Sequence, residues 1–561
     1  MANQGLRDLC FLLLSASADR FLERQWSDGR FATEAERKRD EWNFYDQQYL
    51  LPAALLYTSD RPDSPWRGSA RLWEAILSNG RHLASRVAAD GTMEWRLNGV
   101  VLGSPFVCQR LTCAWLQAYQ LLRDRLPEEE AEQWRSAILR ASTWLYEHKV
   151  RPFRAVTRFT SHQVQTGTNH FSLYLSLLWL AGREFHRPEW VAVSADLMRR
   201  LIADQRPGGY WEEHHGPALG YNYLTYHGVE EYTAWSRDET GQEALRRGLD
   251  LHQHWTYPDG LPIECIDGRM RHVSGPMLWG LSGFTRWPEG RGYARLLLEQ
   301  LAKSEAPLSG ETLARVAVAY LLLCEGDEEL PPQARERYRG ALDGVSIVRK
   351  DGPWVVALSG QCSPPWPENQ FCLDRQALVS VWREGSGLVV DGSNAKFQPE
   401  LATFHRPDGE CLPRSARLLA GAGEEEGIEC RYDTFTAAVR ARILEAEAME
   451  LRVGVSDSRA GGPIIATVVP HVCYGERLTI GAVGSVTLGE APLHLAPREH
   501  GGWLVFRGVT MRLPPDAAIM YPVSPFNSYS ADNRSGPGAN RLVVRWEARE
   551  EEAVLRVWRA S

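Results

Sequence analysis

The spacing of apolar residues changes near residue 330, and this change constrains the fold more than any other feature of the sequence. Before that point, apolar residues recur every three to four positions, as on the buried face of an amphipathic helix. Short runs of Gly, Pro and Asp separate these segments. We therefore predict a long series of hairpin-connected helices, which can stack as a solenoid or close into an (α/α) toroid. No exact repeat period is visible, which favours the toroid. The clearest helical segments are residues 72–87, 111–122, 131–146, 171–180, 190–202, 293–301 and 313–323.

After residue 330 the apolar residues alternate with polar ones, and the chain breaks into short β-branched or aromatic runs. This pattern predicts an antiparallel β-sandwich. We expect a toroid domain at residues 1–330 and a sandwich domain at residues 331–561. A charged, Pro-containing segment at about residues 326–344 is typical of a linker helix or hinge. The predicted strands lie within residues 353–360, 376–392, 435–443, 449–458, 463–472, 478–488, 501–513, 540–548 and 552–560.

Size and charge restrict the kind of partner. The 561 residues are enough for two or more cores, and a net charge of −8 argues against nucleic acid. A basic stretch around Lys149, Arg151, Arg154 and Arg158 is the one place where this acidic chain would attract an anion. No run of eighteen apolar residues occurs, so we expect no membrane span.

The N-terminal apolar run LCFLLLSASA, residues 9–18, has the length of a signal-peptide core. Arg7 and Asp8 before it cancel in charge, however, and the run continues into an amphipathic segment. The ten cysteines show no CxxC pair or regular framework, which fits a reducing compartment. These features favour a cytoplasmic protein over a secreted one.

Two polar clusters carry the candidate chemistry. The first, in RFTSHQVQTGTNHFSLYLSLLWLAG (residues 158–182), places Asn169 and His170 at the start of a strongly apolar helix, with His162 and Gln165 just upstream. Gln109 and Arg110 begin another predicted helix. We interpret Asn169 and His170 as candidate catalytic residues. The candidate substrate-binding residues are Gln109, Arg110, His162 and Gln165.

The second cluster, GGYWEEHHGPALGYNYLTYHG (residues 208–228), contains Tyr221 and Tyr223, together with Glu213 and His214, which are further candidate substrate-binding residues. With Asn169 and His170, the two clusters provide an amide, an imidazole and a phenol. Abstraction of a proton next to a carboxylate needs this set, because the carboxylate must be neutralised while a base removes the proton.

Each of these residues also has a purely structural interpretation. Asn169 is a favoured helix N-cap, and His170 is also compatible with a hydrogen-bonded core histidine. Tyrosines most often serve packing. Glu213 is compatible with a solvated loop or with orienting a histidine.

On these motifs the chain resembles the heparinase II/III-like polysaccharide lyases. The resemblance rests on TGTNHFSLYLSLL, on GGYWEEHHGPALGYNY, and on LVVDGSNAKFQPELATFH (residues 388–405). It implies a toroid joined to a β-sandwich, and cleavage of a uronate polysaccharide or oligosaccharide by β-elimination. By the same resemblance, Asn169 and His170 meet the substrate carboxylate, and Tyr221 or Tyr223 moves the proton.

The resemblance also implies roles in the sandwich. Asn394 lies in a loop that is a candidate for substrate binding. Asp374, Asp391 and His405 are the only arrangement there that suggests a structural divalent ion, of an oxygen-preferring kind. The chemical step itself needs no cofactor in this hypothesis.

Two other functions remain open at this point. A glycoside hydrolase on the same scaffold needs two carboxylates across one bond, for example Glu213 with Asp259 or Glu264. A carbohydrate-binding protein without turnover is the third alternative. The lyase hypothesis is the strongest of the three, because no convincing carboxylate pair is evident.

Overall fold

The computed structural model describes residues 5–97, 100–102, 109–213, 215–269, 275–396, 398–420, 424–445, 448–456, 462–530 and 532–560. The chain divides into two compact units, and each is discontinuous in sequence. Unit 1 comprises residues up to 205, 222–249 and 276–329, and unit 2 comprises residues 206–221, 250–275 and 330–561. Two segments from the helical half of the sequence therefore belong with the strands, which the periodicity did not reveal.

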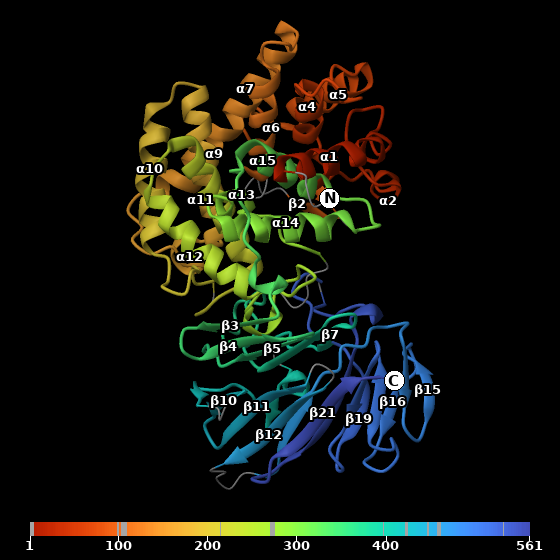
Figure 1. Ribbon diagram of the computed structural model, residues 1–561. Helices are drawn as coiled ribbons and strands as arrows, with labels where there is room; N and C mark the ends of the chain where they lie inside the picture. The colour runs from red at the N-terminus through yellow and green to blue at the C-terminus, as the bar shows by residue number, and fades with distance from the viewer. Residues whose placement is uncertain are drawn as a thin grey trace. The chain divides into compact units, whose positions relative to one another are not determined.

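Helices form unit 1, and every helix predicted from periodicity is confirmed (Figure 1). In α5, for example, Leu72, Ile76 and Leu83 are buried on one face, and Ser69 caps the first turn by accepting a hydrogen bond from the Leu72 amide. The helices are α1 (Leu6–Leu22), α2 (Glu34–Lys38), α3 (Phe44–Gln47), α4 (Leu50–Thr58), α5 (Ala70–Arg86), α6 (Gln109–Leu122), α7 (Glu128–Leu145), α8 (Ser161–Val164), α9 (Thr168–Glu184), α10 (Pro188–Ala203), α11 (Leu219–Ser236), α12 (Thr240–His254), α13 (Leu281–Phe284), α14 (Pro288–Ala302) and α15 (Gly310–Leu322), with a short hairpin of β1 (Trp95–Leu97) and β2 (Val100–Leu102) between α5 and α6.

The helical series closes on itself. Helix α1 packs against α14 and α15, the last helices of the unit. A solenoid would leave its first and last helices apart, so this contact supports the (α/α) toroid. The apolar run at residues 9–18 lies within α1, where Leu9, Cys10 and Leu14 are buried. None of the described helices combines the length and the hydropathy that crossing a bilayer requires.

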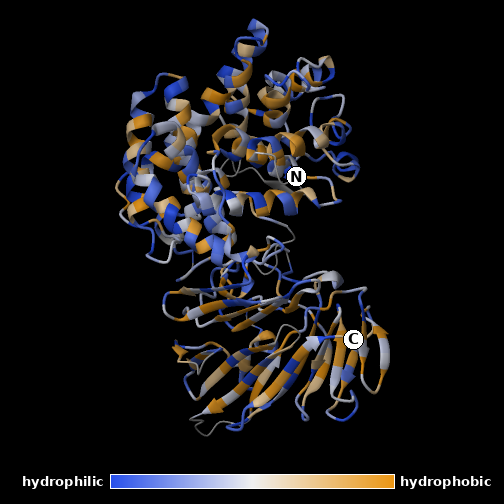
Figure 2. Ribbon diagram, viewed as in Figure 1, coloured by the Kyte–Doolittle hydropathy of each residue, from blue (hydrophilic) through white to orange (hydrophobic). Residues whose placement is uncertain are grey.

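Unit 2 contains three antiparallel sheets, as the alternating pattern predicts. In Figure 2, hydrophobic and hydrophilic residues are interleaved along its strands. The nine-stranded sheet has the order β15-β14-β17-β18-β21-β12-β11-β10-β9, and the two five-stranded sheets have the orders β16-β19-β20-β13-β8 and β3-β4-β5-β6-β7. The strands are β3 (Arg337–Leu342), β4 (Ser346–Asp351), β5 (Trp354–Ser359), β6 (Val379–Arg383), β7 (Gly387–Val390), β8 (Phe404–His405), β9 (Ser415–Leu419), β10 (Glu425–Arg431), β11 (Thr436–Glu445), β12 (Ala448–Ser456), β13 (Ile464–Val468), β14 (Arg477–Ile480), β15 (Gly484–Thr487), β16 (Leu493–Leu495), β17 (Trp503–Phe506), β18 (Val509–Arg512), β19 (Ala518–Val523), β20 (Arg541–Ala548) and β21 (Ala553–Arg559).

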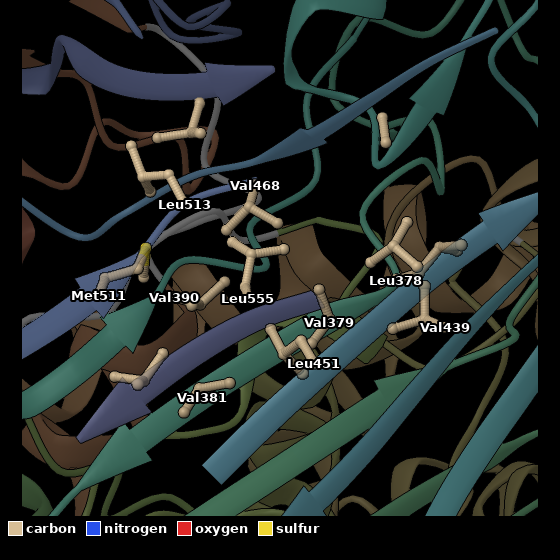
Figure 3. Close-up of a cluster of buried hydrophobic side chains, with 14 of the residues drawn as sticks. Leu378, Val379, Val381, Val390, Val439, Leu451, Val468, Met511, Leu513 and Leu555 are labelled. Atoms are coloured by element: carbon tan, nitrogen blue, oxygen red, sulfur yellow. The ribbon is translucent and has the colours of Figure 1, made fainter. Parts of the chain in front are cut away.

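One hydrophobic core joins all three sheets (Figure 3). It includes Val381 from β6, Leu451 from β12 and Val468 from β13. Burial of such branched side chains stabilises the folded state by about 25 cal/mol for each Å² of apolar surface that is removed from water. This core fixes the sandwich on which the candidate site is built.

The sheet of β3 to β7 is buried on both faces. In β5, Trp354, Val356 and Leu358 face the sandwich core, whereas Val355 and Ala357 face a second core. The second core is completed by residues of the two helical-half segments, among them Tyr210, Leu219, Trp255, Tyr257 and Ile263. The described residues of segments 206–221 and 250–275 therefore pack against the β-sheet, which explains why these segments belong to unit 2. Strand β3 also shows that part of the segment expected to be a linker helix or hinge is a paired strand.

Candidate functional site

A cluster of polar and aromatic side chains surrounds Tyr221 in unit 2. The Tyr221 hydroxyl lies 2.8 Å from the hydroxyl of Tyr529. The Arg269 guanidinium lies over the Tyr221 ring, 4.2 Å from its centre. Phe371 contacts both Tyr529 and Arg269. Its ring centre lies 5.5 Å from that of Tyr529 and 5.7 Å from the Arg269 guanidinium. We refer to Glu213, Tyr221, Arg269, Phe371 and Tyr529 as the tyrosine cluster.

Glu213 provides the counter-charge of this cluster. Its Oε2 lies 3.5 Å from Nη1 of Arg269, and the Glu213 side chain is 2% exposed. Burial by itself would lower the pKa of Arg269, but the nearby Tyr221 and Glu213 more than offset this effect, so the pKa is raised. Arg269 is therefore a permanent positive charge against the phenol ring.

Asp267 positions both functional side chains of the cluster. Its Oδ2 accepts a hydrogen bond from the Gly220 amide at 3.2 Å, just before Tyr221. Its Oδ1 accepts one from the amide of Arg269 at 2.7 Å. A single buried carboxylate thus holds the backbone on either side of the cluster.

Arg375 and Asn394 bind the backbone of the two loops that carry Tyr221 and Arg269. Arg375 donates to the carbonyl oxygens of Ile266 at 2.6 Å and Pro217 at 2.7 Å. Asn394 is fully buried. Its Nδ2 donates to the Asp267 carbonyl at 2.9 Å, while its Oδ1 accepts from two backbone amides. The structure therefore places Asn394, predicted to bind substrate, as a support for the loops.

Replacing Arg375 with Met is expected to destabilise unit 2 by about 3 kcal/mol, because the carbonyl groups of Ile266 and Pro217 each lose a charged donor. The Pro217 carbonyl keeps the weaker hydrogen bond from the Gly268 amide at 3.3 Å. The change also frees the loop that carries Tyr221, so turnover is expected to fall with it. Thermal unfolding and a kinetic assay measure the two effects. Arg417→Met is the matched control, since Arg417 is exposed and, among the described residues, pairs with Glu429 alone. A variant that unfolds like that control would contradict this role of Arg375.

Tyr223 occupies a different environment from Tyr221, although both lie near the start of α11. Tyr223 is 1% exposed, and its hydroxyl is 2.5 Å from that of Tyr293 within unit 1. Residues two apart on a helix do not share a face. The geometry therefore gives Tyr223 a core position and Tyr221 a partly exposed one.

In unit 1, Asn169 is in the first turn of α9 but is not its N-cap, since Gly167 takes that place. The capping interpretation is therefore wrong. Asn169 is 1% exposed, and its Oδ1 accepts no hydrogen bond within the described residues. A buried acceptor without a partner is unusual, because it has lost its hydration without compensation.

His170 is fixed by Gln109, another predicted site residue. Nε2 of Gln109 lies 2.9 Å from Nδ1 of His170. An amide nitrogen only donates, so Nδ1 of the imidazole accepts. The proton of the neutral ring is then on Nε2, which makes that atom a donor.

The other predicted binding residues have varied surroundings. Arg110 forms an ion pair with Glu311 at 2.5 Å and stacks over Phe44 and Trp279, so its charge is already balanced. Gln165 is exposed and ends α8 with a left-handed backbone. His214 and the side chain of His162 lie outside the described residues.

Two of the four residues of the basic stretch upstream of α9 form ion pairs. Arg151 forms an ion pair with Glu147. Arg158 forms one with Asp204 at 3.0 Å. These pairs reduce the attraction for an anion that the sequence alone suggested.

Glu264 and Asp259, the two carboxylates considered as partners of Glu213 in a hydrolase, both accept hydrogen bonds from other residues. Glu264 Oε1 accepts from Ser380 Oγ at 2.8 Å and from the Gly392 amide at 2.9 Å. Oδ2 of Asp259 accepts from the Trp382 indole at 2.7 Å. Neither group is free to act across a glycosidic bond with Glu213 in this arrangement.

Glu264 nevertheless predicts a pH dependence of stability. Burial and the negative charge of Asp391 raise the pKa of Glu264 to about 7. The folded state therefore binds this proton more tightly than the unfolded chain, and the stabilisation present at low pH is lost as the pH rises through 7. We expect Glu264→Gln to gain about 1–3 kcal/mol over the wild type at about pH 8 and little at about pH 5. Thermal unfolding at the two pH values measures the difference, and an equal effect at both would contradict the assignment.

Asp391, one of the residues suggested for a divalent ion, is held by cationic side chains. Asp391 Oδ2 lies 2.9 Å from Nε of Arg541 and 3.2 Å from Nδ1 of His471. A guanidinium on the carboxylate repels a cation. Over the described ranges, no three His, Cys, Asp or Glu side chains gather as metal ligands.

Sequence reasoning missed Arg269 and Tyr529. Arg269 follows the motif CIDG, and no spacing rule connects it to Tyr221. Tyr529 lies near the C-terminal end of the chain, 308 positions from Tyr221. Asp267 holds the backbone of both Gly220 and Arg269, and the hydroxyl of Tyr529 meets that of Tyr221 only in the folded chain.

Comparison with known proteins supports the fold. No protein-family model matches the chain, and no curated protein sequence matches it. Among solved structures, it is similar to heparinase III, with a TM-score of 0.54 and 11% identity over 98% of this chain and 85% of that one. It is similar to the Streptomyces coelicolor A3 chondroitin AC lyase solved with chondroitin sulphate, with a TM-score of 0.51 and 12% identity over 98% and 79%.

A Paenibacillus xanthan lyase has a TM-score of 0.53 and 11% identity over 98% of this chain, which spans 57% of that longer protein. At such identities the likeness concerns the fold alone. The chain therefore has the polysaccharide lyase fold, an (α/α) toroid followed by antiparallel β-sheets.

Proposed function

We propose that this chain is a polysaccharide lyase that cleaves a uronate-containing glycan by β-elimination. The observation that carries the proposal is the Arg269 guanidinium held 4.2 Å from the centre of the Tyr221 ring. The pair combines a group that transfers protons with a permanent positive charge. The lyase fold of the chain supports the same reaction class.

The chemistry explains why both groups are needed. The C5 proton of a uronate is only weakly acidic while the neighbouring carboxylate is charged. A positive charge at the carboxylate stabilises the enediolate that forms when the proton leaves. The C4–O bond then breaks, and the leaving oxygen takes a proton. No water is consumed, and the product carries a C4–C5 double bond.

Tyr221 is proposed as the group that moves these protons. As a phenolate it accepts the C5 proton, and as a phenol it returns a proton to the leaving oxygen. Arg269 stabilises the negative charge on the phenolic oxygen through the ring contact. Tyr529 shares a hydrogen bond with Tyr221 and fixes the direction of its hydroxyl. Because Arg269 supplies positive charge, we propose that the chemical step needs no metal ion.

Asn169 and His170 are proposed as substrate ligands, the role that the family resemblance implies. The Oδ1 of Asn169, which accepts no hydrogen bond from the described residues, and the Nε2 donor of His170 support this role. A uronate presents hydroxyl donors and carboxylate acceptors, which match such groups.

Replacing Asn169 with Ala is expected to lower kcat/KM about 10- to 100-fold, by losing an oriented polar contact. Stability is expected to change little by comparison, because the Asn169 Oδ1 makes no hydrogen bond within the described residues. Steady-state kinetics and a melting curve separate the two effects. Wild-type kcat/KM in a folded variant would exclude Asn169 from the site.

A panel of glycans tests the proposed function. The protein is incubated with hyaluronan, chondroitin, dermatan and heparan sulfates, alginate and glucuronan, with and without EDTA. We expect ultraviolet absorbance of an unsaturated uronate from at least one of them, unaffected by EDTA. New reducing ends without that absorbance would indicate a hydrolase, and binding without either would indicate a carbohydrate-binding protein.

A further inference from the structure

The Cys473 thiol in unit 2 is the first of a series of side chains in contact with one another, the others of which are charged. This series is separate from the tyrosine cluster. Cys473 follows β13 and is partly exposed. Its Sγ lies 3.8 Å from Nε2 of His471 and 3.6 Å from Nη2 of Arg507. Nδ1 of His471 is 3.2 Å from Oδ2 of Asp391, which Arg541 also binds at 2.9 Å.

This order of groups, thiol, imidazole and carboxylate, is the arrangement that activates a cysteine. Asp391 and His471 are both buried, so the carboxylate fixes the ring and favours its charged form. Burial by itself would lower the pKa of His471, but its hydrogen bond to Asp391 and its contact with Cys473 raise it to about 9. The ring is therefore an imidazolium at neutral pH.

Below about pH 7, the charges around the thiol balance when sulfur is ionised. The cations are His471, Arg507 and Arg541. The anions are Asp391 and Glu476, while Glu264 next to Asp391 has a pKa of about 7 and is largely neutral below that pH. Three positive charges thus face two negative ones, and a thiolate at Cys473 completes neutrality.

Other described cysteines lack such a setting. Burial raises the pKa of Cys10, Cys265 and Cys430. At Cys473 the hydrogen bond from His471 lowers the pKa instead. Cys324 is exposed but has no such contact with an imidazole and a guanidinium, which makes it an internal comparison.

We propose that Cys473 is an oxidation site that reacts as a thiolate with small hydroperoxides. The sulfur attacks one peroxide oxygen, an S–O bond forms and the O–O bond breaks. The second oxygen leaves as hydroxide from hydrogen peroxide, or as alkoxide from an alkyl hydroperoxide, and takes the proton of the His471 imidazolium to become water or an alcohol. Sulfur loses two electrons to the peroxide and becomes a sulfenic acid.

The backbone around Cys473 favours this chemistry over acyl transfer. An acyl-transfer site needs free amide donors beside the nucleophile to stabilise an oxyanion. The Cys473 amide donates to Glu476 Oε2 at 3.0 Å. The amides of Gly475 and Glu476 donate to the carbonyl oxygens of Leu488 and Cys473. Hydroperoxide attack needs no such donors, and Arg507 and His471 stabilise the departing hydroxide.

Alkylation of the intact wild-type chain measures the ionisation. Iodoacetamide is added at about pH 6.5, and the labelling rate of each cysteine is followed by peptide mass spectrometry. An ordinary exposed thiol is about 1% ionised there. We expect Cys473 to label about tenfold faster than Cys324, because more thiolate outweighs its lower intrinsic nucleophilicity. Equal rates would overturn the proposal.

Oxidation is tested in the same preparation with hydrogen peroxide and dimedone, which traps a sulfenic acid. We expect dimedone on Cys473 ahead of Cys324, and its loss in Cys473→Ser. His471→Ala should remove the rate advantage at about pH 6.5. Arg507→Met serves as a second variant in case the first fails to fold. Dimedone on Cys324 alone, or unchanged rates in both folded variants, would contradict the assignment.

Discussion

Replacing Tyr221 with Phe is expected to lower kcat about 1,000-fold while leaving substrate binding nearly unchanged. The substitution removes only the hydroxyl that exchanges protons. The ring remains, so the contact with the Arg269 guanidinium is kept. Because the interaction lost acts in the transition state, the effect should appear in kcat and not in the affinity for substrate.

Tyr223→Phe is the matched control for this prediction. It removes a hydroxyl two residues away that lies in the core, 2.5 Å from the hydroxyl of Tyr293. We expect a loss of about 1 kcal/mol in stability from the missing hydrogen bond and little change in kcat. Full activity in Tyr221→Phe with a collapse in Tyr223→Phe would transfer the role to Tyr223. Full activity in both would remove the tyrosine assignment.

Replacing Arg269 with Gln is expected to lower kcat/KM about 100- to 1,000-fold. The change removes the positive charge beside Tyr221 and leaves Glu213 without its ion-pair partner. Arg269→Lys restores the charge but not the planar group that stacks on the ring, so we expect partial recovery.

Arg417→Gln is the control for Arg269→Gln, since it removes a guanidinium from the surface of the same unit. Its kinetics should match the wild type. If Arg269→Gln folds and keeps wild-type kcat/KM, the guanidinium has no part in the reaction.

The helices and strands that were predicted could be recognised because each lies in a segment with a regular apolar period. In α5 and β17, for example, burial follows the periods of 3.6 and 2. The strand β3 was missed, because its short charged sequence is also typical of a linker. Its pairing with β4 decides its structure, and such long-range pairing is not visible in a local pattern.

The candidate site was predictable only in part. The sequence pointed to Tyr221 and Tyr223 equally, since burial on opposite sides of one helix turn separates them only in three dimensions. Arg269 could not be linked to Tyr221 from spacing. The link depends on Asp267, which binds the backbone of both loops. Asn394 is a polar residue close to a Gly, as substrate-binding residues often are. In the structure, however, its side-chain amide forms hydrogen bonds with the surrounding backbone.

The most direct test of the central claim is the origin of the oxygen at the cleaved bond. The reaction is run in heavy-oxygen water on the glycan that the panel identifies, and the products are weighed by mass spectrometry. β-Elimination through Tyr221 predicts an unsaturated product, lighter than the hydrolysis product by one water, with no heavy oxygen incorporated. One heavy oxygen at the new reducing end, in a product without a double bond, would contradict elimination.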